Sequence, residues 1–202
     1  MLYLIIAALI VLAAPWFCSF IHRSPRVSKY MDWLISLYVV FAVLFHILPE
    51  SFHIIHNWTV IIAGGSAMGF WLLEAFFANG RREMTYIVIA IAILGLFFHE
   101  AMDGAALAEG DHHHLHKHMV FAVIAHRLPV GMFVWMTLRK YLSWKTSYAC
   151  LILMCTITVL GYFNSHLFIS HAEHDPSFAI FQAIFGGALL HCIWHPVHKH
   201  KH

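Results

Sequence analysis

Charged side chains are scarce in this sequence, and that scarcity excludes most classes of soluble protein. Only 11% of the 202 residues are Asp, Glu, Lys or Arg, whereas 61% are hydrophobic. Soluble domains carry roughly 25% charged residues. A chain of this length cannot bury so much apolar surface in its own core, so lipid must cover part of it. The composition therefore excludes a soluble enzyme, a nucleic-acid binder and a disordered chain.

The sequence also lacks a disulfide pattern and a barrel pattern. Its four cysteines form no Cys-x-x-Cys pair and imply no disulfide framework; they are Cys18, Cys150, Cys155 and Cys192. No segment alternates apolar and polar residues as the strand of a membrane barrel does. These absences leave an all-α membrane protein as the expected fold class.

Long apolar stretches are abundant, and each is close to the ~20 residues that a helix needs to cross a bilayer. We mark seven of them: 2–21, 31–51, 57–78, 85–108, 118–138, 146–169 and 177–195. The first lacks the basic start and the small-residue cleavage site of a signal peptide, so we expect a retained helix. The sequence predicts a polytopic helix bundle of about seven transmembrane helices, forming one membrane domain over residues 1–202.

The basic residues predict the orientation of this bundle. Ten of the twelve Lys and Arg lie in the first, third and fifth loops and in the tail, whereas the other loops contain only Lys117. The positive-inside rule then places the N-terminus outside and the C-terminus inside. We expect an integral protein of a bacterial cytoplasmic membrane, with lipid and a divalent metal ion as partners and no nucleic acid. Seven short helices are also compatible with a homodimer.

Several polar side chains fall inside the apolar stretches, where ionisable groups are costly and usually functional. His99 and Asp103 lie four residues apart and therefore share one face of a helix. An imidazole and a carboxylate form half of a divalent-metal site, and His126 on the next stretch is the natural third ligand. The alternative is that these histidines only bond to neighbouring helices, an interpretation that we favour for His166 and His191.

The same two stretches contain a buried acid and base. Arg127 follows His126 as Glu100 follows His99, so two helices in register would bring Glu100 against Arg127. An unpaired guanidinium would be very unfavourable in a bundle. We expect an ion pair that takes the place of a second cation beside the metal ligands. Gly104 and Pro129 predict that both helices are loosened here, as in many transport sites.

Further histidines and one acid lie at the ends of stretches and in loops. His46 and Glu50 end the second stretch, where they are candidates for a second metal position or for indirect support of the first. Histidine-rich tracts bind borderline metals without a defined geometry. We therefore expect metal gathering by the fourth loop and the tail, with His112, His113, His114, His116, His118, His198, His200 and His202.

Two other functions are compatible with so many histidines. Membrane histidines on separate helices can ligate haem b, and the candidates are His46, His99, His126, His166 and His191. A di-iron hydroxylase would use His-x-x-His pairs, but the predicted orientation places three such clusters outside and one inside. We therefore expect no enzyme.

At these residues the chain resembles the ZIP family of zinc, iron and manganese transporters. His46 to Glu50 is similar to the family's His-x-x-Pro-Glu ending, and His99 to Gly104 is similar to its His-Asn-x-x-Asp-Gly motif. His126 to Val130 resembles its His-Glu-x-Pro-His-Glu motif, and the segment around Gly186 and Gly187 is similar to its late small-residue segment. The resemblance covers roughly residues 31 to 195.

The resemblance implies transport of a divalent ion, Zn²⁺ first and Fe²⁺, Mn²⁺, Co²⁺ or Ni²⁺ as alternatives. It implies that the ion meets His99, Asp103 and His126. The family usually has eight helices and can hold a second metal beside the first. Here Arg127 and Val130 stand where the second metal would need ligands, so the resemblance implies one metal and a guanidinium in the second place. A metal sensor or buffer with the same fold is the alternative.

Overall fold

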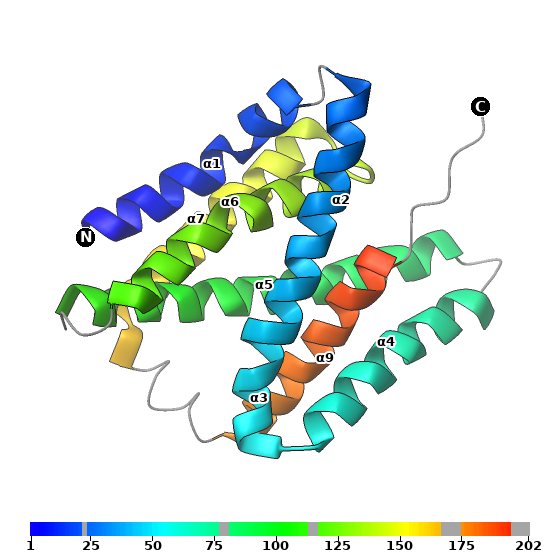
Figure 1. The fold of residues 1–202 in the computed structure, drawn as a ribbon. Coiled ribbons are helices and arrows are strands. Elements are labelled where there is room, and N and C mark those ends of the chain that lie inside the picture. Colours follow the sequence, from blue (N-terminus) through cyan, green and yellow to red (C-terminus); the bar gives the residue numbers. More distant parts are fainter. Residues whose placement is uncertain (22–23, 77–80, 113–116, 167–174, 195–202) are drawn as a thin grey trace. The chain divides into compact units, whose positions relative to one another are not determined.

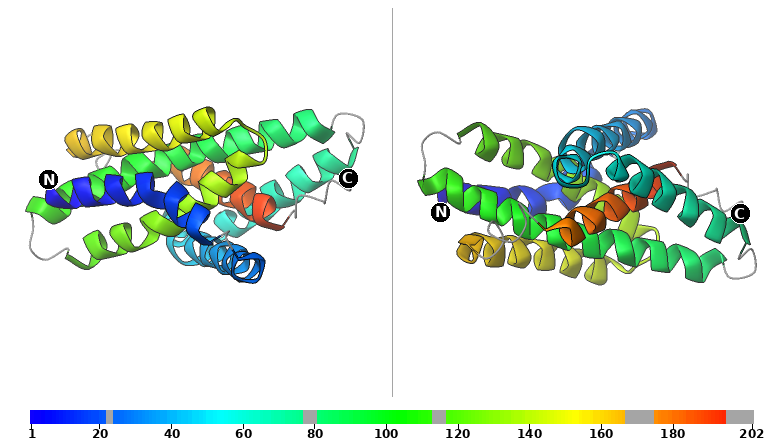
Figure 2. Two further views of the ribbon diagram at one scale, coloured as in Figure 1. Left: turned by 90° about the horizontal axis from the view of Figure 1, so that it is seen from above. Right: turned by 90° about the horizontal axis from the view of Figure 1, so that it is seen from below.

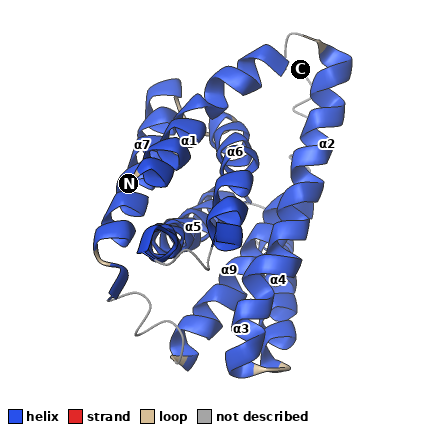
Figure 3. Ribbon diagram, turned by 60° about the vertical axis from the view of Figure 1, so that its left-hand side comes forward, coloured by secondary structure: helices blue, strands red, loops and turns tan. Residues whose placement is uncertain are grey.

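The protein is helical in all of its described regular structure. The computed structural model describes residues 1–21, 24–76, 81–112, 117–166 and 175–194, and Figure 3 shows helices and no strand among them. Six apolar helical segments are long enough to span a membrane: Leu2–Ile21, Tyr30–Ile47, Tyr86–Glu109, Val120–Arg139, Trp144–Phe163 and Pro176–Ile193. A shorter apolar helical run covers Trp58–Leu73. The predicted all-α membrane bundle is confirmed, while the count of seven and the orientation stay predictions.

The chain packs as two compact units, Met1–Val39 with Phe97–His171, and Val40–Leu96 with Ala172–His202. The first unit contains α1 (Leu2–Ile21), most of α2 (Pro25–Ala42), the second half of α5 (Arg81–His112), α6 (Lys117–Arg139) and α7 (Trp144–Phe163). Figure 1 shows the helices in sequence colours. The single membrane domain expected from the sequence stays a prediction.

Within the first unit, α1 packs along both α6 and α7, and α6 also contacts α7. The left-hand view of Figure 2 shows α1 (blue) between α7 (yellow) and α6 (green). Small and branched apolar side chains form the core between them. Its buried members are Leu4, Ala7, Leu107, Val120 and Val123. Its α5 member, Leu107, lies about one turn beyond Asp103.

Two glycines bring the backbones of α5 and α7 together. A Cβ atom at Gly104 of α5 would overlap the carbonyl oxygen of Thr158, and one at Gly161 of α7 would overlap the carbonyl oxygen of Ala101. Small residues allow such close helix packing within a membrane, where packing rather than the hydrophobic effect drives association. Gly104 therefore serves helix packing, next to Asp103.

The second unit contains the first half of α5 with η1 (Val43–Ile47), α3 (Leu48–Ile55), α4 (Trp58–Phe76) and α9 (Pro176–Trp194). Helix α9 contacts η1, α3 and α4. Gly187 of α9 packs against the Ala63 carbonyl and the Ser66 hydroxyl of α4. The buried hydroxyl of Ser51 donates a hydrogen bond of 3.0 Å to Gln182 Oε1. Gly187 thus permits close packing of α9 against α4.

The second expected stretch is interrupted in a way that the sequence analysis missed. Residues Val43–Ile47 form one π-helical segment, and α3 then continues to Ile55 instead of ending at residue 51. Pro49 has no N–H with which to continue the α-helical bonding pattern. A π-helical turn accommodates such a break without ending the helix.

Helices α5 and α6 are continuous through Gly104 and Pro129, and the loosening expected there stays a prediction. Two helix ends differ from the expected stretches. Helix α5 extends to His112 because no strong helix breaker follows residue 108 until Gly110, which the helix tolerates. Helix α7 ends at Phe163, not residue 169, because the Asn164 side chain donates to the Leu160 carbonyl and competes with the next helical bond.

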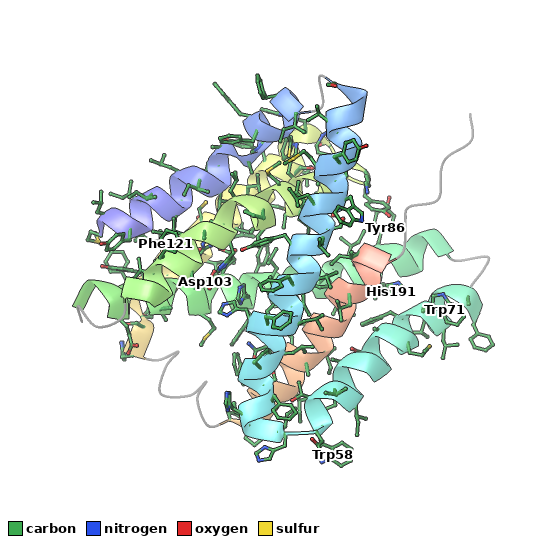
Figure 4. The ribbon with its side chains drawn as sticks, in the orientation of Figure 1. Trp58, Trp71, Tyr86, Asp103, Phe121 and His191 are labelled. Carbon is green, nitrogen blue, oxygen red and sulfur yellow. The ribbon has the colours of Figure 1, made fainter. Side chains whose placement is uncertain are left out.

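Large apolar side chains cover the outside of the helices. Trp58 and Trp71 of α4 and Phe121 of α6 are 64%, 51% and 74% exposed, and Figure 4 labels all three. A soluble protein rarely exposes so many aromatic rings together. The exposed rings and the six spanning segments define the class of the molecule: it is a polytopic integral membrane protein.

Candidate metal centre

The central polar residues of the first unit come from two helices. Helix α5 contributes His99, Glu100 and Asp103, which lie within about one turn of each other and therefore share one side of the helix. Helix α6 contributes the consecutive pair His126 and Arg127. All five belong to membrane-spanning segments, and Figure 4 labels Asp103 among them.

The Asp103 carboxylate lies between the two imidazoles. Its Oδ1 is 3.7 Å from His99 Nε2, and its Oδ2 is 2.7 Å from His126 Nε2. The two rings lie 5.6 Å apart between centroids and are tilted by 35°. The structure therefore brings together the three residues that the sequence analysis selected as metal ligands. Asp103 is only 3% exposed and His126 only 7%.

The backbone holds His126 in an orientation that suits a ligand. Its Nδ1 lies 2.9 Å from the carbonyl oxygen of Ala122, one turn earlier in α6. A carbonyl oxygen only accepts, so Nδ1 carries a proton and donates it. The second nitrogen, Nε2, then points at Asp103. Metal-binding histidines are commonly held in this way, with one ring nitrogen bonded to a carbonyl and the other on the metal.

Glu100 and Arg127 form the buried ion pair that the register of the two helices predicts. Arg127 Nη1 contacts Glu100 Oε2 directly, and both side chains are 1% exposed. Arg127 Nη2 lies 3.3 Å from Asp103 Oδ2. One guanidinium therefore lies against the carboxylates of both Glu100 and Asp103. Its Nε atom is buried and makes no hydrogen bond within the described part of the chain.

A third helix joins this group through Thr158, a residue that the sequence analysis missed. The Thr158 hydroxyl of α7 lies 2.8 Å from Glu100 Oε2 and accepts a hydrogen bond of 3.1 Å from Arg127 Nη1. Thr158 is 2% exposed. The sequence offers only a weak signal: a threonine three residues before Gly161, on the face that can approach another helix. A membrane threonine most often bonds to its own helix, as Thr158 also does with the Met154 carbonyl at 3.1 Å.

The other candidate residues come from other parts of the chain. His46 lies in η1 of the second unit, and its side chain is exposed. Glu50 lies in α3, but its side chain is outside the described part of the structure, as are those of His112 and His118 at helix ends. The remaining candidates lie outside the described residues altogether: His113, His114, His116, His198, His200 and His202.

The two histidines that we assigned to helix contacts have different surroundings. His166 is exposed and follows the end of α7. The sequence analysis had placed it inside the spanning stretch 146–169. His191 is buried in α9, with its ring 6.1 Å from that of Phe70 in α4. This is a ring contact between α9 and α4, and the expected hydrogen bond to a neighbouring helix stays a prediction.

The charges of the group determine its chemistry. Glu100 and Asp103 supply two carboxylates, whereas Arg127 supplies one permanent positive charge. His126 Nε2 lies 2.7 Å from a carboxylate oxygen that only accepts, so Nε2 also carries a proton in this contact. A metal ion on Nε2 would replace that proton. With both imidazoles neutral, the side chains would then carry one net negative charge for the cation to balance. Two imidazole nitrogens and a carboxylate oxygen are ligands for Zn²⁺ and neighbouring divalent metals. The group is therefore suited to hold a divalent cation on Asp103.

The comparisons with other proteins add no family to this picture. No protein-family model, no curated protein and no solved structure matches the chain.

Proposed function

We propose that this protein binds a divalent transition metal ion, Zn²⁺ foremost, and carries it across the membrane. The ligands in this proposal are His99, Asp103 and His126. The observation that carries it is the buried Asp103 carboxylate with an imidazole Nε2 on each side, one from α5 and one from α6. The resemblance to ZIP transporters supports the same function, and we propose a bacterial cytoplasmic membrane as its location.

Binding of the ion requires a small rearrangement. The direct contact of 2.7 Å between His126 Nε2 and Asp103 Oδ2 must be exchanged for two bonds to the metal. The Ala122 carbonyl keeps the imidazole directed at the same place during this exchange. His99 then completes the set from one turn away on α5. A fourth ligand is water or substrate in many Zn²⁺ sites that stay open to exchange.

Metal binding without transport is the second candidate. Helices α5 and α6 are continuous through Gly104 and Pro129, whereas transporter sites usually contain broken helices. This observation favours a sensor or buffer that keeps the same ligands.

The test is Zn²⁺ uptake into proteoliposomes that contain a zinc-sensitive dye, together with the metal content of the purified full chain. The variants are His99→Gln and Asp103→Asn, which preserve side-chain size. The matched controls are His53→Gln on α3 and Asp32→Asn on α2, since both side chains are exposed. The histidine-rich segments are expected to bind Zn²⁺ as well. The Zn²⁺ held at the site is therefore taken as the metal content of the wild type minus that of Asp103→Asn.

Uptake that disappears in both site variants and persists in both controls would support transport through Asp103. Bound Zn²⁺ that depends on Asp103, without uptake in the wild type, would select the sensor or buffer. A wild type that neither takes up Zn²⁺ nor exceeds Asp103→Asn in metal content would contradict both proposals.

A further inference from the structure

The turn between α6 and α7 carries positive charges that no nearby acid of the chain neutralises. Arg139 and Lys140 at the end of α6 and Lys145 at the start of α7 are all exposed. Residues 112–172 contain no Asp or Glu. Among the described residues, none of these three cations has a partner in an ion pair. We call these three residues the basic turn; its charges are open to an anion from outside the chain.

Aromatic rings place the basic turn at the level of the membrane surface. The turn joins two spanning segments, Val120–Arg139 and Trp144–Phe163. Trp144 is 57% exposed, and its ring stacks on that of Tyr148 with 5.6 Å between centroids. Tyr148 in turn meets the buried ring of Trp135 edge-on at 6.4 Å. Trp and Tyr rings are enriched at the level of the lipid headgroups, so the adjacent cations lie at that level too.

The guanidinium of Arg139 is held in place within the turn. Its Nη1 donates a hydrogen bond of 2.9 Å to the Leu142 carbonyl, and its carbon Cζ lies 6.0 Å from the centre of the Trp135 ring. Its other N–H groups make no hydrogen bond within the described part of the chain. A planar guanidinium fits two oxygens of a phosphate group at once. Helix α7 begins in the same turn, after its N-cap Ser143, and the positive end of its dipole adds to the attraction for an anion.

We propose that the basic turn binds the phosphate group of an anionic phospholipid. Arg139 supplies the fixed donors, Lys140 and Lys145 supply further positive charge, and Trp144 packs beside the headgroup. The predicted orientation places this turn on the cytoplasmic side, where anionic lipids attract basic residues next to spanning helices. The inference is independent of the proposed metal function, because none of these residues belongs to the metal centre.

The experiment compares two lipids on the purified full chain in a neutral detergent. Phosphatidylglycerol and phosphatidylcholine are offered at equal concentration, and native mass spectrometry measures how much of each is bound. Lys140→Gln with Lys145→Gln removes two charges of the basic turn, whereas Lys140→Arg with Lys145→Arg keeps them. The matched control is Arg26→Gln with Lys29→Gln, which removes two charges from the start of α2, predicted to lie on the same side.

The wild type, the paired Arg variant and the α2 control should all prefer phosphatidylglycerol. The paired Gln variant should bind phosphatidylglycerol roughly 20- to 30-fold more weakly, which is about five-fold for each cation. Its binding of phosphatidylcholine should be unchanged. A wild type without preference for phosphatidylglycerol would overturn the inference. An equal loss in the α2 control would also overturn it, because the lysines would then act only through the general charge of the surface.

Two further measurements separate lipid binding from other causes. Excess inorganic phosphate should leave phosphatidylglycerol bound, and displacement would replace the lipid site by a site for free anions. Gel filtration should show a monodisperse paired Gln variant, since both lysines are exposed. Lys145→Gln alone is the milder change and should weaken binding of phosphatidylglycerol about five-fold. Unchanged binding in this single variant would count against the inference even if the paired variant did not fold.

Discussion

The hydroxyl of Thr158 lies 2.8 Å from Oε2 of Glu100. This contact joins α7 to an acid on α5, and the hydrogen bond from Arg127 Nη1 to the same hydroxyl brings in α6. Three helices of the first unit therefore meet at one buried oxygen atom. The oxygen has a donor on one side and an acceptor on the other, which makes it a sensitive position for substitution.

Replacing Thr158 by Val should lower the free energy of unfolding by about 1–3 kcal/mol, because two buried polar groups each lose a partner. Thr156 provides a matched control in the same helix. Its hydroxyl also donates to the carbonyl four residues earlier, Ile152, at 3.0 Å, but it is exposed. Thermal unfolding of the two variants in detergent measures the difference. Equal stability of Thr156→Val and Thr158→Val would contradict the bridging role.

Removing one member of the buried ion pair should cost much more than removing both. With a chelator present, Arg127→Ala and Glu100→Ala should each lower the free energy of unfolding by about 3–5 kcal/mol, because each leaves a buried charge unpaired. The double variant should cost clearly less than the sum of the two. A thermodynamic cycle from thermal unfolding checks this, with Arg139→Ala, an exposed arginine at the end of α6, as control. Strict additivity of the single effects would be evidence against the pair.

Glycine substitutions should separate helix packing from backbone propensity. Gly161→Ala and Gly104→Ala place a Cβ atom against a carbonyl oxygen of the other helix, so each should lower the free energy of unfolding by about 1–3 kcal/mol. Gly64→Ala is the control, since no atom lies within 4 Å of its added Cβ. It should be neutral or slightly stabilising because alanine favours helix more than glycine does. Melting curves of the three variants measure the effects, and similar melting points would argue against the close approach of α5 and α7.

The predicted orientation can be tested with cysteines in two turns. In a variant without the four native cysteines, Asn57→Cys should react with a membrane-impermeant maleimide on intact cells, because the turn between α3 and α4 is predicted to lie outside. Thr146→Cys, at the start of α7 beyond the basic fifth loop, should react only after permeabilisation. Both side chains are exposed. The opposite labelling pattern would reverse the predicted orientation.

The sequence predicts the helices well because each needs only a long apolar run to reveal it. It also predicts the pairing of Glu100 with Arg127. An unpaired arginine is too costly inside a bundle, and aligning His126 with His99 places Glu100 opposite Arg127. The clustering of His99, Asp103 and His126 follows from the same register. These predictions depend on strong local signals: helical spacing and the cost of a buried charge.

Features that depend on tertiary contacts were harder to predict. Nothing local distinguishes Thr158, which bonds to two other helices, from Thr156, which faces outward two residues earlier. Pro129 and Gly104 suggest breaks in isolation, yet the neighbouring helices support continuous α5 and α6. The π-helical segment before Pro49 widens one turn without ending the helix, and it packs against α9, a contact that the local sequence does not reveal.

The close approach of α5 and α7 also has a mechanical consequence. Gly104 packs against the Thr158 carbonyl and Gly161 packs against the Ala101 carbonyl. The backbones of the two helices are therefore in close contact at two points one turn apart. Sliding either helix by a single residue would push a side chain into backbone. We therefore expect the second half of α5 and α7 to move together. A movement that exposes the Asp103 carboxylate within this unit would then involve α6, which carries His126 and Arg127.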